Sequence, residues 1–246
     1  MAAFQSQAAG DVINNGIQKE ITDAILQVRL EQKEDEKESS GRGKVQSPIR
    51  KKERPQRRSF ARRLPDRWEA YNPCGKPIAD TRLIAFKTPL RSDFFKETEL
   101  EPFGIDELVE AMEKQNAKLG LVIDLTATTK YYDPVELEQY NIKYKKIMCP
   151  GRDFGGLRDL GDTFMDTIKD YFAENIENDT LIGIHCTHGL NRTGYLVCRY
   201  MHECLGWPVD ESIETFNQAR GHEIERQEYV RALQFECEFH EGSYRC

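Results

Sequence analysis

The chain has 246 residues, with 35 Lys and Arg, 42 Asp and Glu, and 39% hydrophobic residues. This length suits one good-sized domain with an extension and leaves little room for a second full domain. Its seven cysteines lack paired spacing, and we find no secretion signal and no apolar run long enough to span a bilayer. We therefore expect a soluble protein of the cytosol or nucleus, without a membrane partner.

Charge divides the chain into two predicted regions. Residues 1–63 hold 14 Lys and Arg against 9 Asp and Glu, whereas residues 64–246 hold 21 against 33. We expect an N-terminal extension over 1–63 and a folded domain over 64–246. A domain this acidic is unlikely to carry a long basic groove that grips many backbone phosphates. If the domain binds a polyanion, we therefore expect it to bind only the terminus of that polyanion.

The predicted extension begins with a short helix. Aliphatic residues from Ile13 to Val28 recur at spacings of three and four, which predicts a helix over about residues 11–30. A charged run and a segment poor in apolar residues follow, and these we expect to be disordered. Within the latter lies a basic cluster over 50–63, which indicates nuclear targeting, attraction to RNA or simply a solvated linker.

From residue 64 the pattern predicts an α/β domain, with a central, mostly parallel sheet flanked by helices on both faces. We expect strands at 81–87, 121–125, 142–148 and 181–184, and a long loop at 149–161. We expect helices at 105–118, 135–140, 163–175, 193–205, 210–219 and 226–238. Anions bind at the carboxyl ends of strands in such sheets, and Cys186 follows the last predicted strand.

The sequence His-Cys-Thr-His-Gly-Leu-Asn-Arg-Thr-Gly at 185–194 forms the loop between that strand and a helix. Converging N–H groups, the helix N-terminus and a guanidinium all favour a thiolate, so Cys186 is a candidate nucleophile. Arg192 offers a planar fork of donors to phosphate oxygens. Gly189 lets the backbone close around an anion. The Thr193 hydroxyl can hydrogen-bond the sulfur and ease its departure from a thiophosphate.

The backbone of this loop completes the predicted anion site. We expect the N–H groups of Thr187, His188, Gly189, Leu190, Asn191 and Arg192 to bind phosphate oxygens. His188 is expected to orient the loop and Asn191 to hold its shape. A zinc site is disfavoured because the other histidines and cysteines form no second ligand pair at the usual spacing, so we expect neither a metal nor a cofactor.

This loop resembles the signature of the cysteine-dependent tyrosine and dual-specificity phosphatases. The residues of the loop are most similar to those of the RNA 5′-triphosphatase branch. This branch includes capping-enzyme triphosphatase domains, a baculoviral phosphatase and ribonucleoprotein-interacting phosphatases. The last group is the closest match. The resemblance extends through LPDRW at 64–68, IAFKTPL at 84–90, LVIDLT at 121–126, YYDP at 131–134 and FNQARGH at 216–222.

The resemblance implies a dual-specificity-phosphatase-like fold and a metal-independent RNA 5′-phosphatase. It would remove the γ- and β-phosphates of 5′-triphosphorylated RNA through a cysteinyl-phosphate, leaving a 5′-monophosphate. Implied partners are this RNA and ribonucleoprotein or small-RNA-processing complexes, not DNA. Two alternatives stay open: a protein dual-specificity phosphatase, because the same loop serves both, and a ribonucleoprotein-binding module.

Further candidates lie outside the loop. Family members carry a general acid some thirty residues before the cysteine, where this chain offers Asp153, although a turn-forming role is the alternative. Arg220 and Arg226 bracket a turn that the implied fold brings near the site, so they are candidates for the α- and β-phosphates or for surface salt bridges. Lys87 and Arg158 are additional candidates for phosphate binding.

Overall fold

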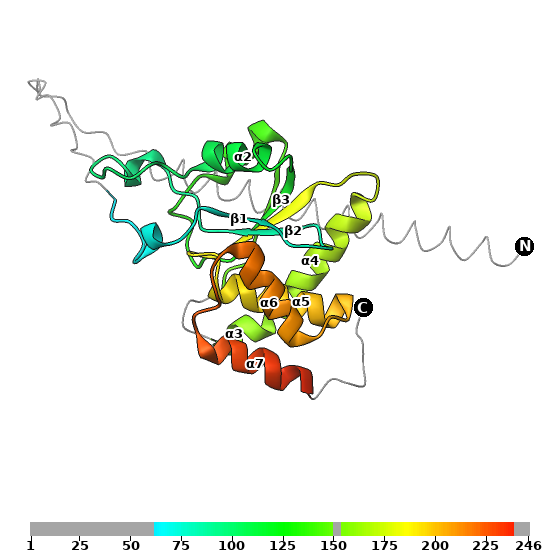
Figure 1. Ribbon diagram of the computed structural model, residues 1–246. Coiled ribbons are helices and arrows are strands. Elements are labelled where there is room, and N and C mark those ends of the chain that lie inside the picture. The colour runs from blue at the N-terminus through cyan, green and yellow to red at the C-terminus, as the bar shows by residue number, and fades with distance from the viewer. Residues whose placement is uncertain (1–61, 150–153, 239–246) are drawn as a thin grey trace, which may run out of the picture. The chain divides into compact units, whose positions relative to one another are not determined.

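The structure is a computed structural model that describes residues 62–149 and 154–238, all within one compact unit. Five strands form one sheet in the order β1-β2-β5-β3-β4 (Figure 1). Their bounds are β1 Cys74–Pro77, β2 Leu83–Phe86, β3 Leu119–Asp124, β4 Lys143–Lys146 and β5 Leu181–His185. Only β1 runs antiparallel to its neighbour, and the other pairs are parallel.

Helices cover both faces of the sheet. The α-helices among the described residues are α2 Ile105–Glu113, α3 Phe154–Asp159, α4 Gly161–Glu174, α5 Asn191–Leu205, α6 Val209–Arg220 and α7 Gln227–Glu238. Short 3-10 helices add η1 Trp68–Ala70, η2 Ser92–Phe94 and η3 Pro134–Tyr140. The expected fold class, a mostly parallel sheet flanked by helices on both faces, is confirmed.

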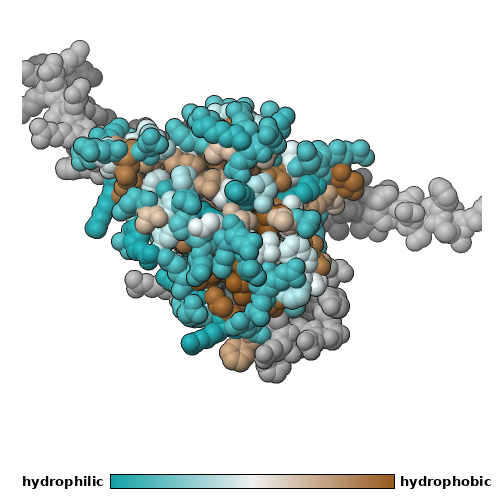
Figure 2. All heavy atoms as spheres, viewed as in Figure 1, coloured by the Kyte–Doolittle hydropathy of each residue, from teal (hydrophilic) through white to brown (hydrophobic). Residues whose placement is uncertain are grey.

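Side chains of the central strands alternate between two cores. On β5, Ile182 and Ile184 pack with α3 to α7, whereas Leu181 packs with α2 and the 3-10 helices. Because both faces of β5 are covered, its five residues are all buried, as expected for a central parallel strand. The edge strand β4 instead presents lysines to solvent. The face drawn in Figure 2 is mostly hydrophilic, with small apolar patches.

The register brings strand ends together at one edge. Ile184 lies opposite Ile123 on one side and Ala85 on the other, and Asp124 lies opposite His185. The residues that follow β2, β3 and β5 therefore meet at the carboxyl edge of the sheet, where Cys186 begins the next loop.

The prediction of a loop over 149–161 is wrong for residues 154–161, which the structure describes as helical over most of their length. Helix α3 occupies 154–159 and α4 begins at Gly161. Glycines disfavour helix by about 1 kcal/mol each, but burial of Leu157 in the core outweighs that local preference.

Smaller differences have local causes. The helix expected to run to residue 118 ends at Glu113, because Asn116 adopts a left-handed backbone with φ 53° and the Ala117 N–H bonds back to Met112. The helix at 134–140 is 3-10, capped by the Asp133 side chain. Strand β1 was missed because it is short and contains Gly and Pro.

Residues 1–61 lie outside the described residues, so the helix expected at 11–30 and most of the basic cluster stay predictions. The boundary between extension and domain at residue 63 also stays a prediction. No helix in the described ranges combines the length and the apolar character needed to cross a membrane.

We expect Phe164→Ala to lower the free energy of unfolding by about 3–5 kcal/mol, because Phe164 on α4 is fully buried and the substitution leaves a cavity. Urea unfolding followed by circular dichroism measures this. Ile176→Ser is the control: its side chain is 77% exposed, so the change should stay within about 0.5 kcal/mol. Equal effects of the two substitutions would contradict the described core.

Candidate active site

Cys186 stands at the start of the loop between β5 and α5. Gly189 within this loop has φ 67°, and a Cβ atom there would lie 2.1 Å from the carbonyl oxygen of Phe86. The loop therefore packs directly against the end of β2, at a distance only glycine allows. This close packing fixes the path of the backbone around the thiol.

The Cys186 side chain is buried, with 3% of its surface exposed. Burial alone raises the pKa of a thiol, but here the Arg192 charge, the Thr193 hydroxyl and the N–H groups of Thr193 and Leu190 outweigh it. Together they lower the pKa of Cys186 to about 7. A large fraction of this thiol is therefore a thiolate at neutral pH.

Thr193 has its buried hydroxyl beside the sulfur. Among the described residues this hydroxyl has no hydrogen-bond partner, yet its proximity contributes to the lowered pKa of Cys186. Its hydrogen is thus available to the thiolate, which agrees with the position expected for it.

Arg192 is held rigidly at the carboxyl edge of the sheet. Its Nη1 donates to the carbonyls of Leu125 at 3.0 Å and Cys149 at 2.9 Å, and its Nη2 donates to the Thr187 hydroxyl at 3.1 Å. Leu125 and Cys149 follow β3 and β4. Within the described ranges these bonds use three of the five guanidinium N–H groups, which leaves a pair of N–H groups to bind an anion.

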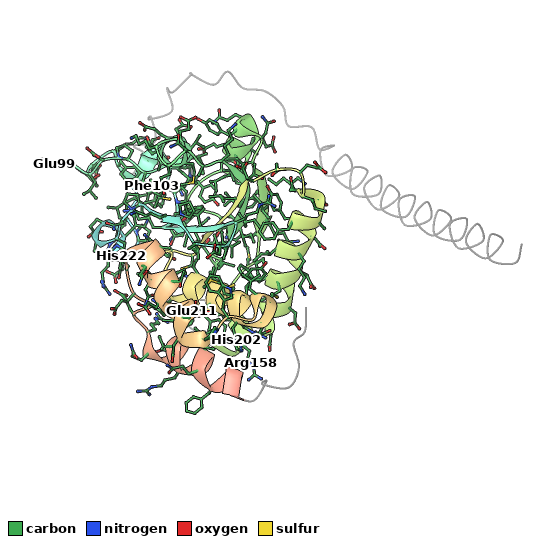
Figure 3. All side chains as sticks on the ribbon, turned by 45° about the vertical axis from the view of Figure 1, so that its right-hand side comes forward. Glu99, Phe103, Arg158, His202, Glu211 and His222 are labelled. Carbon is green, nitrogen blue, oxygen red and sulfur yellow. The ribbon has the colours of Figure 1, made fainter. Side chains whose placement is uncertain are left out.

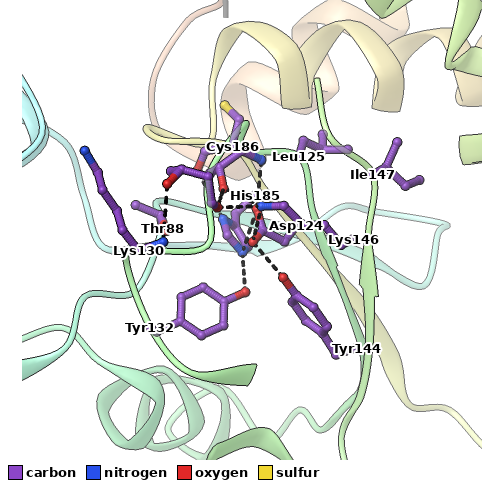
Figure 4. A network of polar contacts seen from close by, with 12 residues as sticks. Thr88, Asp124, Leu125, Lys130, Tyr132, Tyr144, Lys146, Ile147, His185 and Cys186 are labelled. Carbon is purple, nitrogen blue, oxygen red and sulfur yellow. Dashed lines mark hydrogen bonds and ion pairs between the residues drawn. The ribbon is translucent and has the colours of Figure 1, made fainter. Parts of the chain in front are cut away.

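A buried polar network lies beneath the loop (Figure 4). The His185 Nδ1 atom is 3.1 Å from the Cys186 carbonyl, which can only accept, so Nδ1 carries the hydrogen. Nε2 then accepts from the Tyr132 hydroxyl at 2.8 Å. Burial lowers the pKa of His185 and keeps it neutral near pH 7. His185 therefore fixes the backbone on which Cys186 sits.

Asp124 and Lys146 connect β3 with β4 in the same network. Lys146 Nζ donates to Asp124 Oδ2 at 2.8 Å, to Thr126 Oγ1 at 2.7 Å and to the Thr128 carbonyl at 2.8 Å. Burial by itself raises the pKa of Asp124, but the charge that His185 carries when protonated below neutral pH, the Lys146 charge and the Thr126 N–H outweigh it and lower that pKa. The strand ends that hold Arg192 are thus tied together.

His188 and Asn191 anchor neighbouring segments to the loop. The His188 Nε2–H donates to the Asp66 carbonyl at 2.7 Å, and its ring lies 4.8 Å from that of Tyr71. The Asn191 Oδ1 accepts from the Arg226 N–H at 2.9 Å. Both side chains therefore tie neighbouring segments to the loop, and their expected roles in orienting the loop and holding its shape stay predictions.

The loop opens into a pocket of about 440 Å³. The described residues that line it are Arg63, Leu64, Pro65, Asp66, Lys130, Tyr131, Cys186, Thr187, His188, Asn191, Arg192, Arg226 and Tyr229. Four of them are cations and only one is a carboxylate. The structure therefore brings the loop and Arg226 together, and it adds Arg63 and Lys130, which the sequence analysis did not place at the site. The pair of arginines at 62–63 was the one sign in the sequence that basic residues from this segment could reach the site.

Two basic candidates are buried and do not line the pocket, so their expected phosphate-binding role is wrong. Lys87 donates to the carbonyls of Trp68 at 3.2 Å and Tyr71 at 3.0 Å, and burial next to Arg220 lowers its pKa to about 8. Arg220 is 1% exposed and donates to the carbonyls of Gly189 at 3.2 Å and His188 at 3.0 Å. Both act as internal supports beneath the site.

The remaining candidates lie elsewhere. Arg158 is exposed on α3, outside the described lining of the pocket, and Figure 3 shows it at the far end of the helical layer from His222. Its expected contact with phosphate is therefore not supported. Asp153 lies outside the described residues and stays a prediction. No cluster of three His, Cys, Asp or Glu side chains within 62–149 and 154–238 is placed to hold a metal ion.

A cysteine–arginine loop after the central strand of such a sheet defines a phosphatase of the cysteine-dependent class. The pattern for the dual specificity phosphatase catalytic domain matches residues 104–238, and the chain belongs to this family. The family resemblance inferred from the loop and flanking motifs is confirmed.

Three relatives are similar over most of this chain. The RNA/RNP complex-1-interacting phosphatase homolog of Caenorhabditis elegans is 42% identical, covering 70% of this chain and 75% of the relative. The tyrosine-protein phosphatase of Autographa californica nuclear polyhedrosis virus is 45% identical, covering 69% and 98%. The RNA/RNP complex-1-interacting phosphatase of Rattus norvegicus is 43% identical over 73% of this chain, which spans only 55% of that relative.

We expect alkylation of Cys186 by iodoacetamide to show a midpoint near pH 7, set by its thiolate fraction. In Arg192→Ala the midpoint should rise toward the ordinary thiol value of about 8.5, because the favourable charge is lost. Mass spectrometry of the Cys186 peptide across pH measures this. Cys149 serves as the internal control, since burial raises its pKa to about 12. A midpoint unchanged by Arg192→Ala would refute the assigned electrostatic effect.

Asp124 should make stability depend on pH. Its folded-state pKa is lowered, so its contribution is complete above the unfolded value of about 3.9 and is lost as pH falls through the folded value. We expect Asp124→Asn to cost about 3 kcal/mol at neutral pH and to flatten the loss of stability on acidification. Urea unfolding at several pH values, with the exposed Asp170→Asn as control, tests this. A profile parallel to the wild type would contradict it.

Proposed function

We propose that this chain is an RNA 5′-phosphatase that removes the γ- and β-phosphates of 5′-triphosphorylated RNA without a metal ion. The observation that carries the proposal is a buried thiol, with a pKa of about 7, in a pocket that four cations and one carboxylate line. Relatives named RNA/RNP complex-1-interacting phosphatases add support. The nucleophile and the compensating charge both come from side chains, so the reaction needs no metal.

The charge of the pocket suits a row of phosphates. Each phosphoryl group of a triphosphate carries about one negative charge or more. Cys186, Arg192 and Arg226 line one pocket, so two successive phosphates can each meet an arginine. A phosphotyrosine peptide presents only a single phosphate. We infer that Arg226, as a second cation beside Arg192, favours the polyphosphate terminus.

The first step is attack of the Cys186 thiolate on the γ-phosphorus. A sulfur–phosphorus bond forms, the bond from phosphorus to the bridging oxygen breaks, and its electron pair leaves on the β-phosphate. The two remaining Arg192 N–H groups and the N–H groups of the loop bind the non-bridging oxygens as charge grows on them. Because these donors are already oriented, little reorganisation is needed.

The leaving group in this step is a phosphate anion, which is more stable than an alkoxide and needs less help from an acid. Asp153 stays the candidate acid. Water then attacks the cysteinyl-phosphate, the sulfur–phosphorus bond breaks, and inorganic phosphate is released. The Thr193 hydroxyl stabilises the departing sulfur by donating to it. The same cycle on the β-phosphate leaves a 5′-monophosphate.

We expect the wild type to release both labels from γ- and β-labelled triphosphorylated RNA in the presence of a chelator. Cys186→Ser should lower kcat by at least about a thousandfold, because no nucleophile of comparable strength replaces the thiolate. A phosphotyrosine peptide is assayed in parallel, and Asp153→Ala tests the acid. Radiolabel release measures kcat/KM for each substrate.

The outcomes separate the rival functions. Faster turnover of the peptide than of the RNA would show a protein phosphatase instead. No Cys186-dependent turnover of either substrate would favour a binding module. Undiminished turnover by Asp153→Ala would remove that residue from the mechanism and leave the rest of the proposal intact.

A further inference from the structure

A group of cations lies at the wall of the pocket that is built from residues 63–66 and from the connection after β3. Arg63 and Lys130 line the pocket there, and both are exposed. They come from segments distant in sequence from each other and from the loop that holds Cys186. We call these two residues, together with the neighbouring Arg62, the cationic wall.

Specific contacts assemble this wall. Arg62 Nη1 and Arg91 Nη2 both donate to the carbonyl of Lys130, at 3.2 and 2.6 Å. The Arg62 guanidinium also lies 5.8 Å from the ring of Phe94, and Lys130 Nζ lies 5.3 Å from the ring of Tyr131. In Figure 4 the Lys130 side chain extends away from the buried Asp124 network. Contacts between segments distant in sequence therefore hold these cations close to one another.

Nearby acids do not balance these charges. Asp66 is the one described carboxylate that lines the pocket. The main partner of Asp93 is Lys96, and this ion pair lowers the pKa of Asp93. The charges of Arg62 and Arg91 have a weaker effect on the same carboxylate. Gathering like charges costs energy unless an anion compensates them. An unbalanced cluster on an otherwise acidic domain is typical of a surface that binds a polyanion.

The wall is separate from the groups that contact the reacting phosphate. Arg192 belongs to α5 beside the thiol, and the backbone of Arg226 is fixed by Asn191. We propose that the cationic wall is a second subsite, which binds the internucleotide phosphates of RNA just downstream of its 5′ end. The ring of Tyr131 lies beside it as a surface on which a base stacks. This inference rests on the proposed function.

The consequence is discrimination by chain length. A nucleoside triphosphate fills the pocket at the loop but has no downstream phosphates, so it gains nothing from the wall. An RNA of several nucleotides gains both sets of contacts. The wall thus explains how a pocket with a general affinity for phosphate would prefer RNA ends over free nucleotides.

The test compares wild type with the double variant Arg63→Gln, Lys130→Gln. For triphosphorylated RNA of several nucleotides we expect KM to rise about tenfold, with a smaller effect on kcat. Competition by a nucleoside triphosphate should stay unchanged. The slope of log affinity against log salt concentration should fall by about 0.7 for each phosphate that the wall no longer neutralises.

Two controls accompany this variant. Lys114→Gln with Lys169→Gln makes the same charge change at exposed positions outside the pocket lining, and it should leave KM unchanged. Asp66→Asn removes the carboxylate of the pocket, and it should lower KM for RNA. An unchanged KM in the wall variant, or an equal weakening of nucleoside triphosphate binding, would overturn the proposal.

A binding measurement separates this proposal from the proposed function. If wild type fails to hydrolyse triphosphorylated RNA in a Cys186-dependent way, the proposed function fails by itself. The wall is then judged with Cys186→Ser protein and a fluorescent RNA that carries a 5′-hydroxyl. Binding that is weakened about tenfold by the wall substitutions supports the subsite, and binding that is unaffected rejects it.

Discussion

The bonds of Arg192 to the carbonyls of Leu125 and Cys149 are the constraint on which the site depends. They place one guanidinium across the ends of β5, β3 and β4, which are adjacent in the sheet. The same charge lowers the pKa of Cys186, so the geometry of the sheet and the ionisation of the thiol are coupled. A shift of either strand end would move the guanidinium and change the thiolate fraction. The Lys146–Asp124 pair opposes such a shift.

Cations of this acidic domain fall into two groups that differ in burial. Lys87 and Arg220 are buried and donate to backbone carbonyls, where they hold the loop and the segment before β1 in place. Arg63, Lys130 and Arg226 instead line the pocket. Burial lowers the pKa of both Lys87 and Arg220. Their hydrogen bonds to backbone carbonyls give the loop rigid support. The pocket therefore concentrates positive charge within a domain whose net charge is negative.

The core of the candidate site was predictable because its chemistry is contiguous. Cys186, Gly189 and Arg192 lie within one short stretch of sequence, the loop after β5 and the start of α5, and each residue type has a clear reason to be there. The rest of the lining was not predictable, since residues such as Lys130 reach the pocket from another segment. The burial of Arg220 was also missed, because a basic residue next to a turn gives no sign of which way it faces.

By itself, the sequence determined the class of fold and the identity of the loop, because alternating apolar runs and a strand–loop–helix motif are local patterns. Only the tertiary structure decided the antiparallel pairing of β1, the helix at 154–159 and the composition of the pocket wall. In each of these cases long-range packing outweighs local preference: burial of Leu157 overrides its neighbouring glycines, and Arg62 meets Lys130 across 68 residues of chain. Such contacts arise from the folded arrangement of the sheet, and no short stretch of sequence encodes them.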